Sequence, residues 1–71
     1  MEYLIVKFEE DRGVVIDDNP QGRTNIEIEL EKGTHVIRLA TPPKDFTPEK
    51  IKIVLENTTF ISPKEVCFDK I

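Results

Sequence analysis

The chain has 71 residues and a formal net charge of −4, with 14 acidic and 10 basic side chains. This length fits one small domain, residues 1–71, which buries only about 60% of the surface that its unfolded chain exposes. The basic residues are scattered and outnumbered, which argues against nucleic-acid binding, because a phosphate backbone needs clustered Lys and Arg. The segment MEYLIVKFEED has neither a basic leader nor a long apolar run. We therefore expect no signal peptide, no membrane insertion, and a complete small cytoplasmic protein.

The N-terminal third predicts short strands separated by turns. Apolar residues of the first run fall on one face: Leu4, Val6 and Phe8. After a charged turn, residues 14–17 (VVID) are short and β-branched, which suits a strand. Residues 18–22 (DNPQG) form a dense turn signal, because Pro20 fixes φ and Gly22 tolerates positive φ.

Residues 26–31 show the cleanest alternation in the chain. One face carries Ile26, Ile28 and Leu30, and the opposite face carries Glu27, Glu29 and Glu31. The acidic face must be in contact with water. A turn ending at Gly33 and a second apolar run, residues 34–40, follow at once. The two runs predict a β-hairpin.

Residues 50–56 permit a strand or a short helix. Thr47 and Pro48 resemble the start of a helix, with Ile51, Val54 and Leu55 at helical spacing. The same segment also alternates between apolar and charged residues. We favour a strand, because an isolated helix of this length is marginal in water and the neighbouring segments read as strands. Residues 60–62 (FIS) and 65–71 (EVCFDKI) are the last predicted strands.

Six or seven short strands with frequent turns predict an all-β fold, a small antiparallel β-sandwich or a barrel-like relative of one. The central segment also carries recognisable motifs: VVIDD leads into a turn, GRTN (residues 22–25) precedes the strand IEIEL, and GTHVIRL (residues 33–39) follows. In this order and spacing, residues 14–39 resemble the PEGA domain, where a Gly-x-Thr-Pro step and a Gly-x-His turn flank the corresponding strand.

One segment and two single positions depart from that family pattern. EEDR replaces the Pro-Glu-Gly-Ala signature, Asp18 stands where Gly is usual, and Asn25 stands where Pro is usual. The resemblance implies a small β-sandwich of the immunoglobulin or prealbumin type. It also implies a module often appended to cell-surface, envelope or signalling proteins, with no catalytic residues.

His35 and Cys67 are the only histidine and cysteine. A metal site needs three or four ligands, so His35 is expected to share the face of Ile37 and Leu39 and to hydrogen-bond beside the Gly33 turn. Cys67 lies between Val66 and Phe68, so it faces outwards if they face inwards. We expect no catalytic pair, no metal and no cofactor, although an exposed Cys67 is open to oxidation.

Two acidic surfaces are candidates for binding. Residues 9–11 and 17–19 end two short strands and can approach as a weak cation site if those strands pair. Solvated turns are the simpler interpretation. The stripe formed by Glu27, Glu29 and Glu31 is a candidate docking surface for a basic partner. The alternative interpretation is that the stripe is the outer face of a sheet, where its charges discourage aggregation and can pair with Lys50 and Lys52.

The sequence therefore favours a non-catalytic structural or protein-interaction module over an enzyme. The expected partner is a protein, or a second copy, bound through an exposed edge strand. The alternative is a small ligand-binding domain for a saccharide or a cation. Phe46, on a proline-rich loop, is expected to be either a core residue or an anchor for a partner.

Overall fold

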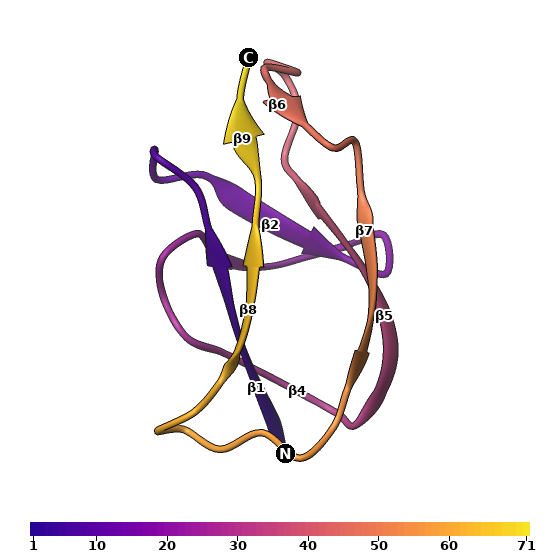
Figure 1. Ribbon diagram of the computed structural model, residues 1–71. Coiled ribbons are helices and arrows are strands. Elements are labelled where there is room, and N and C mark those ends of the chain that lie inside the picture. Colours follow the sequence, from indigo (N-terminus) through magenta and orange to yellow (C-terminus); the bar gives the residue numbers. More distant parts are fainter.

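The computed structural model describes residues 1–71 and contains nine β-strands and no helix (Figure 1). The strands in chain order are β1 (Glu2–Lys7), β2 (Gly13–Ile16), β3 (Asn19–Arg23), β4 (Ile28–Leu30), β5 (Gly33–Leu39), β6 (Phe46–Thr47), β7 (Ile51–Leu55), β8 (Lys64–Cys67) and β9 (Asp69–Lys70). No helix that could span a membrane is present.

Two main sheets form the layers of the molecule. One has the order β4-β1-β8 and the other β3-β2-β5-β7, and the short ribbon β6-β9 joins the two layers near the C-terminus (Figure 1). The predicted all-β sandwich is confirmed. One strand pair departs from the antiparallel expectation, because β8 runs parallel to β1, with Val6 opposite Val66.

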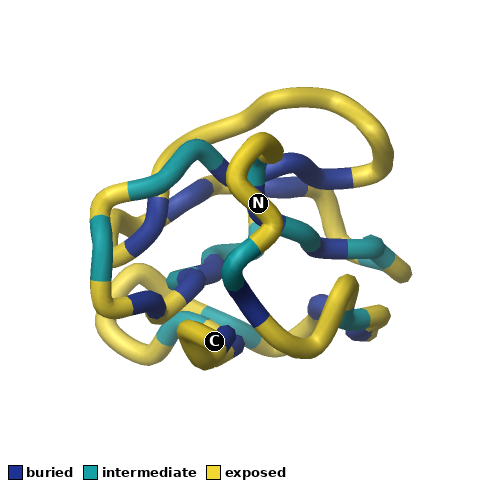
Figure 2. Tube along the Cα trace, turned by 90° about the horizontal axis from the view of Figure 1, so that it is seen from above, coloured by how far each residue is buried: buried dark blue, intermediate teal, exposed yellow.

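The core lies between the sheets and consists almost entirely of inward-facing strand residues (Figure 2). Alternation along β1, β5 and β7 places every second residue inside, as expected for a pleated strand. The residues with no exposed surface are Leu4, Val6, Ile16, Ile37, Leu39 and Leu55. Residues 51–55 form a strand, which confirms the preferred interpretation of that segment.

The predicted hairpin of residues 26–40 is wrong. Strand β4 pairs with β1, with Glu29 opposite Tyr3. Strand β5 pairs with β2 and β7 in the other sheet, so the turn at Gly33 crosses between layers. Ile28 and Leu30 are buried as predicted, but Ile26 is 58% exposed because it lies in the turn before β4.

A hairpin forms earlier in the chain instead, between β2 and β3. Its turn is made by Asp17 (φ 52°) and Asp18 (φ 67°), and positive φ at two successive positions suits a tight two-residue turn. Residues 19–22, predicted to be part of a turn, therefore belong to a strand. Residues 60–62, predicted to be a strand, form a turn closed by reciprocal backbone hydrogen bonds between Thr59 and Ser62.

Candidate interaction surfaces

The two sheets leave four strands at their edges, and three of these are short or irregular. Strand β3 contains Pro20 and a register shift opposite β2. Strand β4 has three residues and β8 has four. Proline, bulges and short length are features that discourage pairing with another chain. Strand β7 has none of them, and its five residues are in continuous register with β5.

The hydrogen bonds of β5 establish which way the backbone of β7 points. The amide and carbonyl of Val36 both face β2, since Val36 N–H donates to Asp17 Oδ1 (2.9 Å) and Asp17 N–H donates to the Val36 carbonyl (3.0 Å). Val36 lies opposite Lys52, so this pair is not hydrogen-bonded and the backbone groups of Lys52 point away from β5. Because the direction of the backbone groups repeats every two residues along a strand, the N–H and C=O of Val54 also point away from β5.

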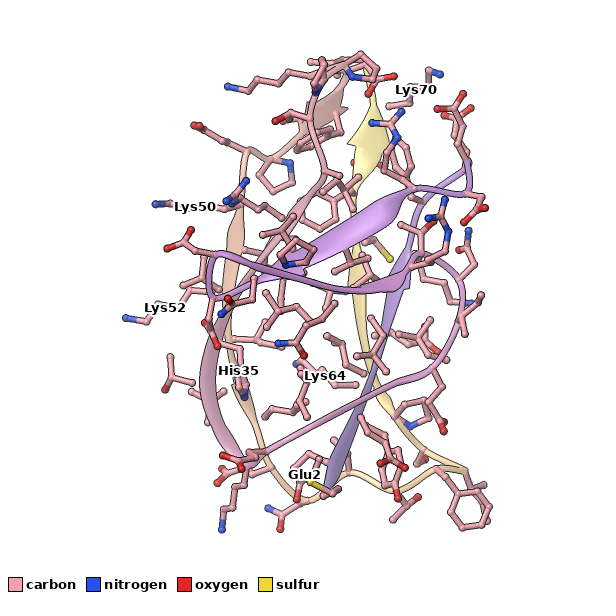
Figure 3. All side chains as sticks on the ribbon, turned by 180° about the vertical axis from the view of Figure 1, so that it is seen from behind. Glu2, His35, Lys50, Lys52, Lys64 and Lys70 are labelled. Carbon is pink, nitrogen blue, oxygen red and sulfur yellow. The ribbon has the colours of Figure 1, made fainter.

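The backbone N–H and C=O groups of Lys52 and Val54, which we call the free edge of β7, therefore have no neighbouring strand. Val54 is 59% exposed although it is β-branched and apolar. Lys50 and Lys52 are exposed and extend away from the body of the molecule (Figure 3). The free edge of β7 is thus accessible to an extended chain.

The acidic stripe is exposed as predicted but has different neighbours. Glu29 faces solvent on the outer side of the three-stranded sheet, and Glu27 and Glu31, on either side of β4, are exposed. The predicted cross-strand pairing with Lys50 and Lys52 is wrong, because those lysines are on or beside β7 in the other sheet.

Phe46 is a core residue rather than an exposed anchor. It is 3% exposed and packs edge-to-face on Phe68, with ring centroids 5.7 Å apart. Of the two roles expected for Phe46, the structure supports the core role, and its inclusion in an interaction surface is wrong. Phe60, in the turn before β8, is the exposed phenylalanine at 67%.

His35 joins two turns of the chain and lies on the inner side of β5, as predicted. Its Nδ1 lies 2.6 Å from Asp17 Oδ2, and its Nε2 lies 2.8 Å from the Glu31 carbonyl oxygen. Burial opposes the charged ring, yet the hydrogen bonds to Glu31 and Asp17 outweigh it and raise the pKa of His35. The hydrogen bond from the Val36 amide lowers the pKa of Asp17, and the hydrogen bond with His35 lowers it further. This arrangement is suited to holding the turns together.

The GRTN segment also has a structural role, which sequence reasoning did not assign. A Cβ on Gly22 would lie 2.7 Å from Ile28, and its φ is +76°, so glycine is required there. Thr24 is 2% exposed. Its hydroxyl donates to the Glu10 carbonyl (2.6 Å) and accepts from the Arg12 amide (2.9 Å). The segment therefore fixes the loop between β1 and β2.

Comparison with known families matches residues 8–62 to the model of the PEGA domain. This match covers well over half of the chain. The protein belongs to the PEGA-domain family. Comparisons with curated proteins and with solved structures found no match.

Two departures from the usual PEGA pattern have local explanations. Asp18 occupies a left-handed position, φ 67°, which aspartate tolerates better than most residues. Asn25 has φ 65°, a conformation closed to proline. Its side-chain amide donates to the Phe8 carbonyl (2.8 Å) and accepts from the Phe8 amide (3.3 Å). In this PEGA domain the Asn25 side chain thus pairs with the backbone of Phe8, the residue that follows β1.

A network of ion pairs closes the end of the PEGA domain that carries β6 and β9. Arg12 is bonded to both carboxylate oxygens of Asp45 (3.0 and 3.2 Å) and to Glu10 (3.0 Å). Lys70 bonds to Glu10 and lies 3.5 Å from Asp45. The guanidinium also lies 5.4 Å from the centre of the Phe8 ring. The alternation of apolar and polar residues does not predict this network, because its members lie in loops and in the last strand.

The remaining candidates from the sequence do not converge. Cys67 faces outwards as predicted, on a different sheet from His35. Strands β1 and β2 do not pair, so the condition for a cation site between residues 9–11 and 17–19 is not met. No group of three His, Cys, Asp or Glu side chains is placed to hold a metal ion.

Proposed function

We propose that this PEGA domain is a non-catalytic interaction module that binds an extended protein segment along the free edge of β7. The observation that carries the proposal is the outward direction of the Lys52 and Val54 backbone groups on a regular strand with no neighbour. An added strand gains hydrogen bonds from these groups, and its side chains can contact Val54.

The arrangement of polar residues supports a binding role rather than a catalytic one. Both ring nitrogens of His35 contact oxygen acceptors within the domain, which leaves neither for a substrate. Cys67 has no histidine beside it, since His35 lies in the other sheet. A nucleophile and its base need to be within hydrogen-bonding distance.

A proline at Val54 tests the proposal. Val54→Pro removes an N–H of the free edge and leaves the β5–β7 hydrogen bonds, which involve residues 51, 53 and 55. We expect this variant to lose the proteins that the immobilised wild-type domain captures. The matched control, Val54→Thr, keeps the N–H and the β-branched shape and should capture them as before.

Amide hydrogen exchange locates the contact independently. On binding of a captured protein, the amides of Lys52 and Val54 should gain protection, and those of β8 should not. Equal capture by the proline and threonine variants, with thermal melting showing both folded, contradicts the proposal.

A further inference from the structure

We propose that a second copy of this chain binds the free edge of β7, antiparallel and centred on Ile53. This inference rests on the proposed function and names its partner. It follows from the order of charges along β7 and from the direction of the backbone groups, each of which limits the possible registers.

A closed dimer formed through one edge strand has two-fold symmetry, so the two β7 strands run antiparallel. Outward-pointing residues have to meet outward-pointing residues, because only these have free backbone groups. Lys52 and Val54 point outward within β7, and Lys50 and Glu56, which directly flank the strand, join this set if the two-residue period continues by one residue at each end. Among the registers that satisfy this condition, those centred on residue 52, 53 or 54 align at least three residues of β7.

The register centred on Ile53 uses the strand best. It aligns all five residues of β7 (Ile51–Leu55) with the same five of the second copy. It places Lys52 opposite Val54, whose exposed side chain then packs on the aliphatic part of the lysine. Ile51 lies opposite Leu55, which continues the apolar inner face of the sheet.

Charge disfavours the register centred on residue 52, and strand length disfavours the one centred on residue 54, whereas the register centred on Ile53 satisfies both. It places Lys50 of each copy opposite Glu56 of the other, giving two cross-strand pairs of opposite charge. Both residues are exposed, and neither forms an ion pair within the molecule. The register centred on residue 52 instead sets Lys52 against itself. The register centred on residue 54 aligns only residues 53–55 of β7.

Charge reversal tests the register. In the Lys50→Glu dimer, a carboxylate at residue 50 of each copy faces the carboxylate of Glu56 in the other copy. In the Glu56→Lys dimer, two ammonium groups face each other at the same two places. Each variant alone should raise the dimer dissociation constant by about tenfold, measured by analytical ultracentrifugation. An equimolar mixture of the two variants restores both opposite-charge pairs, so the mixture should form a heterodimer with near wild-type affinity.

Charge-matched controls are Lys44→Glu and Glu27→Lys, which change exposed residues outside β7 and should leave association unchanged. A wild-type dimer that tolerates Lys50→Glu but is lost in Lys52→Glu overturns the register, because only the pairing centred on residue 54 puts Lys52 opposite Glu56. A wild-type monomer at every concentration overturns self-pairing. The Val54→Pro experiment on captured proteins then still decides the proposed function separately.

Discussion

His35 shows how one side chain can hold two chain connections in place at the same end of the molecule. Its ring contacts the β2–β3 turn through Asp17 and the β4–β5 connection through the Glu31 carbonyl. Because both ring nitrogens face oxygen acceptors, the doubly protonated ring satisfies both contacts at once. The neutral ring can donate to only one of them. The charged form is therefore the one that the fold selects.

This preference predicts how stability depends on pH above neutrality. The pKa of His35 is raised in the folded state, so its contribution is fully present below the unfolded value of about 6.5 and is lost as pH rises through the folded value. Thermal melting of the wild type should therefore show a fall in Tm as the pH rises above about 6.5. His35→Gln cannot titrate and should have a flatter profile. Parallel profiles for the two proteins would contradict this role.

Strands were easier to predict than their partners. Alternation predicted β1 and β5 and the burial of Ile28 and Leu30 between exposed glutamates. For β7 it competed with helical spacing, and the marginal stability of a short isolated helix decided for a strand. Alternation did not show that β4 joins β1 and β5 joins β2, because a hairpin and a crossing between layers have the same local pattern. Strand β3 was missed since NPQGR is exposed throughout and has no apolar face.

An aromatic pair in the core lies beneath the β6–β9 ribbon. Phe46 in β6 packs on Phe68 beside β9 and is buried, whereas Phe60 is exposed in a turn. Phe46→Ala should therefore lower the free energy of unfolding by about 3 to 5 kcal/mol. Phe60→Ala should change it by no more than about 0.5 kcal/mol. Urea denaturation measures both, and similar losses in the two variants would show that Phe46 is not a core residue.

The stability of the whole molecule depends on carboxylates that are ionised in the fold, so we expect it to be highest within a limited pH range. Several carboxylates have a lowered pKa because each accepts hydrogen bonds in the fold: Glu2 from Thr58, Glu10 from Lys70, Asp11 from Arg23 and Asp45 from Arg12. Their contribution is present above the unfolded values of about 4 and is lost as pH falls through the folded ones.

Together with His35, this places the maximum stability between about pH 5 and pH 6.5. Thermal melting across pH 3 to 9 should give a Tm that falls on both sides of this range. A Tm at pH 3 equal to that at pH 6 would show that the carboxylate contacts do not contribute. The family match and the sandwich were predictable from motifs and strand count, but these loop contacts depend on tertiary proximity that no local pattern encodes.

The parallel pairing of β1 with β8 has a consequence for how the protein is made. Leu4 and Val6 are synthesised long before Val66, which lies opposite Val6 in β8. Contacts between residues so distant in sequence form slowly, because a long loop has to close first. The growing chain can therefore pair β1 with β4 early, but the other edge of β1 stays open until the segment around Val66 has been synthesised.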